Sequence, residues 1–214
     1  MTNFKVMLAH PVGKKEFDKD SFIQPKLDGV RCYITKNGAF SRNHKRFMNV
    51  QHILDELVPL FTKYPNVVLD GELYNHEYKD NFNKIISLVR KQSPSDAERN
   101  EAKAIQFHNY DIFMPETPDN SFDYRNQTIK NLHKEFTLQY CKTVETYHVQ
   151  SDVTARLCII NLLLNKAMKA QYYVITNHMN KNAVTIYKNT KNSTTLKRRS
   201  SAGWKAKANV LARS

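Results

Sequence analysis

A lysine followed by a tight turn is the first feature of the sequence that could do chemistry. Lys26 lies in the segment QPKLDGVR, where Asp28 and Gly29 form a predicted turn after a short strand. A lysine can attack phosphorus only in its neutral form, and an ordinary lysine (pKa ~10.4) is neutral in roughly one molecule in a thousand near pH 7.4. Burial and neighbouring cations would raise that fraction. Taken alone, the pattern is also typical of a surface lysine beside an Asp-Gly turn.

Two further segments carry residues of matching chemistry. Asp70 opens the turn in VVLDGELY, 44 residues after Lys26, and Glu72 follows it. A carboxylate just beyond a buried strand can hold a ribose hydroxyl or a metal ion. In FHNYDIF, Tyr110 precedes Asp111 on a predicted strand, where its ring could stack on a purine base. Packing or turn formation explains each segment alone, but the order and spacing of all three are hard to obtain by chance.

The elements that position these residues mix without a βαβ rhythm. Periodicity and turn residues predict three strands within 22–47, including a hairpin through KNG, and further strands at 104–113, 138–149, 171–177 and 183–188. The segment 66–74 is predicted as a buried strand followed by the turn that Asp70 opens. Helices are predicted over 48–64 (with Pro59 straining the last turn), 80–91 (with Asp80 as the cap), 124–136 and 152–170, and residues 91–102 form a polar loop or short helix. This order favours an α+β fold with antiparallel sheets over a doubly wound fold.

The charge of the chain is unevenly distributed. The net charge is +13, and residues 153–214 carry 12 of the 33 Lys and Arg residues and none of the 20 Asp and Glu residues. Such an asymmetry indicates a face that binds a polyanion such as nucleic acid, although a merely solvated basic surface would give the same pattern.

Several classes of protein are excluded by composition. No apolar run approaches the ~20 residues of a membrane span, and the first residues have no signal-peptide core. The three cysteines are widely spaced and form no CxxC, so neither a disulfide framework nor a zinc site is indicated. We therefore expect a cytoplasmic protein that is not secreted and has no membrane partner.

Together the motifs resemble those of the ATP-dependent DNA ligase family, in particular the nucleotidyltransferase (adenylation) domain of its phage and viral members. The resemblance covers about residues 5 to 207. The matching residues are, in order, Met7-Leu8-Ala9, the lysine motif Lys26-x-Asp28-Gly29-x-Arg31, Ser41-Arg42, Asp70-Gly71-Glu72, Tyr110-Asp111, Tyr124-Arg125 and the closing Trp204-Lys205-x-Lys207.

The resemblance implies nucleotidyl transfer, with Lys26 as the catalytic nucleophile. Lys26 would attack the α-phosphate of ATP to form lysyl-AMP, and the AMP would pass to the 5′-phosphate of a nick, which the 3′-hydroxyl then seals. Glu72 would bind the ribose or a metal ion, Mg²⁺ or Mn²⁺. The implied nucleotide-binding residues are Gln24 at the adenine edge, Arg31 and Arg42 at phosphates, Glu72, Tyr110 on the adenine face, and Lys205 and Lys207 at the α-phosphate.

The implied partner is nicked duplex DNA, bound by a monomer in repair, replication or recombination. The implied location is the cytoplasm of a bacterium or of a cell infected by a phage or virus. The expected organisation is an adenylation domain over 1–207, an α+β arrangement of antiparallel sheets flanked by helices, and a short disordered tail over 208–214.

Two features depart from the family. Asn182-Ala183 stands where a Glu-Gly pair with a metal-binding glutamate is expected, and no acid follows Asp152. Seven residues follow Lys207, whereas an OB barrel needs on the order of 25–30 residues in its strands. These departures predict that this chain has no OB domain and seals nicks slowly.

Two alternatives remain open. A non-catalytic relative that binds nucleotide or nicked DNA would explain the missing glutamate, but the intact Lys26 and closing lysines count against it. An RNA ligase or a capping guanylyltransferase would share the lysine motif, whereas the sequences Met7-Leu8-Ala9 and Asp70-Gly71-Glu72-Leu73 favour a DNA ligase.

Overall fold

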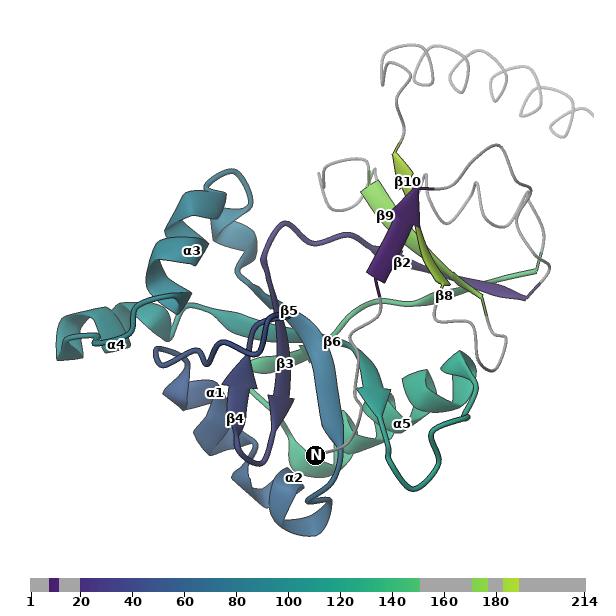
Figure 1. The fold of residues 1–214 in the computed structure, drawn as a ribbon, viewed down its shortest axis with the longest axis horizontal. Helices are drawn as coiled ribbons and strands as arrows, with labels where there is room; N and C mark the ends of the chain where they lie inside the picture. Colours follow the sequence, from purple (N-terminus) through teal and green to yellow (C-terminus); the bar gives the residue numbers. More distant parts are fainter. Residues whose placement is uncertain (1–7, 12–19, 151–170, 177–182, 189–214) are drawn as a thin grey trace, which may run out of the picture.

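The chain folds into two five-stranded sheets with helices packed around one of them (Figure 1). The computed structural model describes residues 8–11, 20–150, 171–176 and 183–188. The predictions for Met7, the helix over 152–170, Asn182, Trp204, Lys205, Lys207 and the tail lie outside these residues.

The first sheet has the strand order β4-β3-β5-β6-β7. Its strands are β3 (Val30–Thr35), β4 (Gly38–Phe40), β5 (Val68–Tyr74), β6 (Gln106–Phe113) and β7 (Cys141–Thr143). The predicted hairpin is confirmed by β3 and β4, and its turn ends at Gly38, whose φ of 130° suits glycine.

The second sheet has the order β1-β10-β9-β2-β8. Its strands are β1 (Leu8–Pro11), β2 (Ser21–Pro25), β8 (Tyr147–Val149), β9 (Gln171–Thr176) and β10 (Ala183–Lys188). The segment 138–149, predicted as one strand, forms two: β7 pairs with β6 and β8 pairs with β2. The chain therefore crosses from one sheet to the other at residues 144–146.

Not every strand pair is antiparallel. The edge pairs β6–β7 and β1–β10 are parallel. A parallel pair needs a long crossover, and α5 (Phe122–Phe136) provides it between β6 and β7. The α+β class is as expected, with one βαβ unit that the sequence pattern did not reveal.

The main core lies between one face of the first sheet and the helices. Alternation along β3 and β5 turns Cys32, Ile34, Leu69 and Leu73 toward this core. The other face carries polar residues of the same strands, including Arg31, Asp70 and Glu72. The helices supply core residues such as Ile53, Leu60, Ile85, Leu88, Ile129 and Leu132.

The predicted helix over 48–64 is two helices, α1 (Gln51–Glu56) and α2 (Val58–Lys63), separated at Leu57. Pro59 lies in the first turn of α2, where a missing N–H costs no intrahelical hydrogen bond. The prediction that Pro59 strains the end of a single helix was therefore wrong.

Helix ends follow local capping chemistry. Helix α3 (Phe82–Val89) begins after Asn81, whose side chain accepts from the Lys84 N–H, so the prediction of Asp80 as the cap was wrong. Helix α4 (Asp96–Ala102) begins with a reciprocal capping box between Ser95 and Glu98. A short 3₁₀ helix, η1 (His76–Tyr78), links β5 to α3. Among the described residues, no helix combines the length and the apolar character that crossing a membrane requires.

Candidate active site

Lys26 lies at the end of β2, on the turn that leads into β3. Its side chain is about a quarter exposed, and Nζ lies 3.3 Å from Asp28 Oδ1. The turn requires glycine at position 29: a Cβ there would lie 2.4 Å from the Leu73 carbonyl oxygen and 2.7 Å from Glu72 Cγ. Gly29 thus lets the lysine-bearing turn lie directly against β5, beside Glu72.

Arg31 is held by a carboxylate on the neighbouring strand. Its Nε donates to Asp70 Oδ1 at 2.9 Å and its Nη2 to Asp70 Oδ2 at 2.6 Å, a bidentate pair. Burial alone would lower the pKa of Arg31, but Asp70 and Tyr110 together raise it well above its ordinary value. Asp70 is nearly fully buried, and burial raises its pKa to about 6 against the opposing effect of Arg31.

Tyr110 sits on a β-bulge. Asp70 pairs with Asp111 and Gly71 pairs with Asn109, so Tyr110 is the extra residue of β6. A bulge re-aims the inserted side chain, and the Tyr110 ring lies beside Arg31, whose Cζ is 4.8 Å from the ring centroid.

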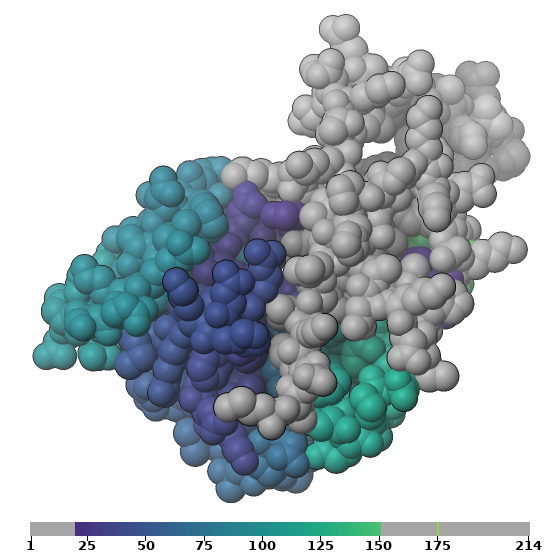
Figure 2. Space-filling view, viewed as in Figure 1, coloured from purple at the N-terminus to yellow at the C-terminus, as the bar shows by residue number. Residues whose placement is uncertain are grey.

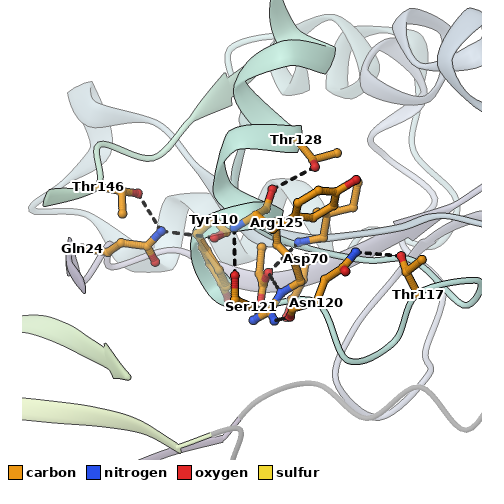
Figure 3. A network of polar contacts seen from close by, with 12 residues as sticks. Gln24, Asp70, Tyr110, Thr117, Asn120, Ser121, Arg125, Thr128 and Thr146 are labelled. Carbon is orange, nitrogen blue, oxygen red and sulfur yellow. Dashed lines mark hydrogen bonds and ion pairs between the residues drawn. The ribbon is translucent and has the colours of Figure 1, made fainter. Parts of the chain in front are cut away.

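A second Arg–Asp pair closes the other side of the bulge. Arg125, from α5, donates through Nε to Asp111 Oδ1 at 2.7 Å and through Nη2 to Oδ2 at 3.1 Å. Its Nη1 donates to the Asn120 carbonyl at 2.6 Å. Two buried carboxylates that lie opposite each other on β5 and β6 are therefore each paired with an arginine, which fixes the strand that carries Tyr110. Figure 3 shows Asp70, Tyr110 and Arg125 close together.

Gln24 connects the two sheets. Its Nε2 donates to the Tyr110 carbonyl at 3.1 Å and to Thr146 Oγ1 at 2.9 Å (Figure 3). Gln24 is only 2% exposed. The residue two positions before Lys26 is thereby tied to the backbone of Tyr110.

Glu72 lies beside the lysine-bearing turn, directly opposite Arg31 in the register of β3 and β5. Burial raises its pKa from the ordinary 4.5 to about 8, although Arg31 and Lys26 oppose the shift. Burial keeps this carboxyl group partly protonated near neutral pH, and a divalent cation that binds there would displace the proton into solvent. Mg²⁺ is often bound by one or two carboxylates together with substrate phosphates. Glu72 therefore suits a metal ion, and no cluster of three metal-ligating side chains occurs in the described part of the chain.

The free energy of unfolding should fall as the pH rises toward 8. Because the pKa of Glu72 is higher in the folded protein, its stabilising contribution is complete below pH 4.5 and lost as the pH passes about 8. Asp70 acts in the same direction between 3.8 and about 6. His52 and His133, whose pKa burial lowers from 6.5, act in the opposite direction up to about pH 7, so the effect of Glu72 is read as the difference between the parent and a variant without this carboxylate.

Urea unfolding of the parent and of Glu72→Gln at pH 6, 7 and 8 measures this effect. The glutamine variant should lose the decline in this window, while Glu77→Gln, at an exposed position, should keep it. An unchanged decline in Glu72→Gln would contradict the assignment.

A basic pocket adjoins this site. It has a volume of about 800 Å³ and is bounded by the start of β3, the turn after β4 and the end of α3. Figure 2 shows these segments on one face, the purple and blue residues of β3 and β4 beside the teal residues of α3. The lining includes five cations and no acid: Arg31, Arg42, Lys45, Arg46 and Arg90.

The structure brings together most of the predicted site residues. Gln24, Lys26, Arg31, Glu72 and Tyr110 lie at the junction of β2, β3, β5 and β6, and Arg42 lines the adjoining pocket with Arg31. Lys205 and Lys207 lie outside the described residues.

Some residues of the site were not assigned roles from the sequence. Asp111 and Arg125 enter the sequence prediction only as parts of motifs, and their acid and guanidinium types are the available signal. Asp70 is predicted to open a turn and to hold a ribose hydroxyl or a metal ion, but it lies within β5, and Arg31 donates to both of its carboxylate oxygens. No pattern in the sequence indicates that Thr146 belongs to the site, because it lies in a connection between strands of different sheets and contacts Gln24 from 122 positions away.

The arrangement is similar to that of solved ligases. A Lig E DNA ligase, described under "DNA binding with a minimal scaffold", matches 88% of this chain and 70% of its own, with a TM-score of 0.63 and 16% identity. A Chlorella virus DNA ligase-adenylate matches 88% and 70%, with a TM-score of 0.62 and 16% identity. An archaeal ATP-dependent RNA ligase matches 86% of this chain and 46% of its own, with a TM-score of 0.52 and 17% identity. The fold is that of the ligase nucleotidyltransferase domain.

The family follows from the sequence profile. The model of the family described as "ATP dependent DNA ligase domain" matches residues 6–196. The chain therefore belongs to the ATP-dependent DNA ligase domain family, and the resemblance inferred from its motifs is confirmed. A comparison with curated protein sequences gave no match.

Proposed function

We propose that the chain is the adenylation domain of a DNA ligase that forms lysyl-AMP on Lys26 and seals nicks in duplex DNA. The observation that carries the proposal is the convergence of Lys26, Glu72 and the Tyr110 bulge at the junction of the two sheets.

In the first step, Lys26 Nζ attacks the α-phosphorus of ATP. The new N–P bond forms as the bond to pyrophosphate breaks, and the attacking nitrogen then releases one proton to solvent. Arg31 can contribute positive charge near the phosphates, since Asp70 engages its Nε and Nη2 and leaves Nη1 as a further donor. Glu72 would hold the metal ion, Mg²⁺ or Mn²⁺, which when bound would neutralise charge on the phosphate oxygens.

The purine would lie against the Tyr110 ring, with its edge toward Gln24. The bulge takes the Tyr110 ring out of the register of the sheet. The ion pair with Asp70 holds the Arg31 guanidinium beside that ring. The strand period places Gln24 and Lys26 on one side of an extended chain, on the order of 7 Å apart along it. This spacing suits a nucleotide whose base and α-phosphate meet the two side chains.

The basic pocket would take the phosphodiester backbone of DNA. Arg42, Lys45, Arg46 and Arg90 are exposed, and none of them forms an ion pair within the described residues. Unpaired cations at a concave surface suit a polyanion.

Removing Arg46 or Arg90 should weaken the binding of nicked duplex DNA and reduce its salt dependence. Each lost phosphate contact should lower the slope of log K against log salt by about 0.9. Fluorescence anisotropy across a salt series measures the slope for Arg46→Ala and Arg90→Ala. Arg99→Ala, on the exposed surface of α4 away from the pocket, is the control and should leave the slope unchanged. Equal slopes in all three variants would argue that DNA binds elsewhere.

The proposed reaction is tested with α-labelled ATP and magnesium, followed by denaturing electrophoresis and a sealing assay on nicked DNA. Covalent label and sealed duplex support the proposal; nucleotide binding without label indicates a non-catalytic relative. Nicked RNA belongs in the same panel because an archaeal RNA ligase shares the fold. Sealing of RNA in preference to DNA would favour that second candidate.

A further inference from the structure

The orientation of the Gln24 amide is fixed by two acceptors. The Tyr110 carbonyl can only accept a hydrogen bond, so the amide must present its NH₂ group there. Tyr110 is the bulge residue, which the register of the β5–β6 pair skips.

Thr146 fixes the second half of the amide. Its hydroxyl donates to the Val144 carbonyl at 3.0 Å, so toward Gln24 it acts as an acceptor and receives a hydrogen from Nε2 at 2.9 Å. Both hydrogens of the amide nitrogen are then used. Turning the amide over would place its oxygen against two acceptors, which is unfavourable in a site where Gln24 is 2% exposed.

The amide oxygen is the part of Gln24 that remains for a ligand. Within the described residues, Gln24 donates to Tyr110 and Thr146 and its Oε1 has no hydrogen-bond donor. Figure 3 shows this oxygen turned away from Thr146. Gln24 thus presents an acceptor beside the residue whose ring is proposed to stack on the base.

We infer that Thr146 is a positioning residue that makes the site selective for adenine over guanine. The inference rests on the proposed function, which places a purine against Tyr110. Adenine carries an amino group at position 6 of its ring and can donate to Gln24 Oε1. Guanine carries a carbonyl oxygen there, which would face another acceptor. If the amide were free to turn, its NH₂ group could serve guanine equally well.

The test measures equilibrium binding of ATP and GTP by titration calorimetry in the parent, Thr146→Val and Thr146→Ser. The parent should prefer ATP. Valine keeps the shape of threonine but accepts no hydrogen bond, and the ATP:GTP affinity ratio should fall about 5- to 10-fold, in line with one hydrogen bond. Serine keeps the hydroxyl and should retain the ratio within about twofold.

A merely structural role for Thr146 would weaken both nucleotides together and leave the ratio unchanged, which would overturn the inference. Equal affinities for ATP and GTP in the parent would also overturn it. The Gln24→Met variant controls for a folding defect. Its ATP:GTP affinity ratio should already be low, and adding Thr146→Val to it should not change the ratio further. A further fall in that background would show that Thr146 does not act through Gln24.

Failure of the inference and failure of the proposed function give different results. Binding involves no covalent step, so ATP selectivity that depends on Thr146 in a protein that forms no lysyl-AMP upholds the inference and rejects the reaction. Label formed equally from ATP and GTP upholds nucleotidyl transfer and rejects the inference. A parent that binds neither nucleotide rejects both.

Discussion

Lys26→Arg should abolish covalent transfer of AMP to the protein without unfolding it. Arginine stays charged at any pH the protein tolerates, so it cannot supply the lone pair that attacks the α-phosphorus. It can keep the ion pair with Asp28, and the side chain at this position is about a quarter exposed, so the stability should change by no more than about 0.5 kcal/mol.

The measurement is label retained on the protein after denaturing electrophoresis with α-labelled ATP and magnesium. Lys45→Arg is the matched control, because Lys45 is exposed in the adjoining basic pocket and has no proposed covalent role. That variant should be labelled as well as the parent. Retained labelling in Lys26→Arg would falsify the assignment of the nucleophile.

The local parts of this site were predictable from the sequence. The Asp-Gly turn after Lys26, the hairpin through KNG and the strand over Gln106–Phe113 are all set by residues close together in the chain, where turn chemistry and the period of two act directly. Three motifs in a fixed order then sufficed to indicate the family.

The contacts that assemble the site were not predictable in the same way. The Asp70–Asp111 juxtaposition depends on a register shift at one position, and nothing in FHNYDIF distinguishes a bulged strand from a regular one. The division of the segment 138–149 between two sheets depends on which strand edges are free to pair. Its consequence, the contact from Thr146 to Gln24, spans 122 positions and therefore left no local pattern.

The predicted helix boundaries were wrong for a simpler reason. The apolar spacing over 48–64 continues through Leu57, so periodicity predicted one helix, whereas Pro59 is best accommodated in the first turn of a new helix. Asp80 and Asn81 are both good caps, and the helix begins after the second, whose side chain accepts from the Lys84 N–H.

Removing the Asp70 carboxylate should have the largest effect on stability and should also impair labelling. In Asp70→Ala the Arg31 guanidinium keeps its charge but loses both hydrogen bonds, and breaking a buried pair in this way costs about 3–5 kcal/mol. Because the Arg31 side chain is 25% exposed and can recover some water, we expect the lower end, about 3 kcal/mol, by urea unfolding. Labelling should fall as well, because Arg31 is no longer held beside the Tyr110 ring.

The double variant Arg31→Met, Asp70→Leu separates the two effects. Apolar side chains of similar size often replace a buried ion pair with little loss of stability, so this variant should recover most of the unfolding free energy. It should not recover labelling, because no guanidinium remains beside the phosphates or the ring. Glu135→Ala, which breaks an exposed pair with Lys63, should cost less than about 1 kcal/mol and leave labelling intact. If the double variant recovered labelling together with stability, the Arg31–Asp70 pair would serve the fold alone, and the charge that stabilises the transferring phosphate would have to come from other cations of the site.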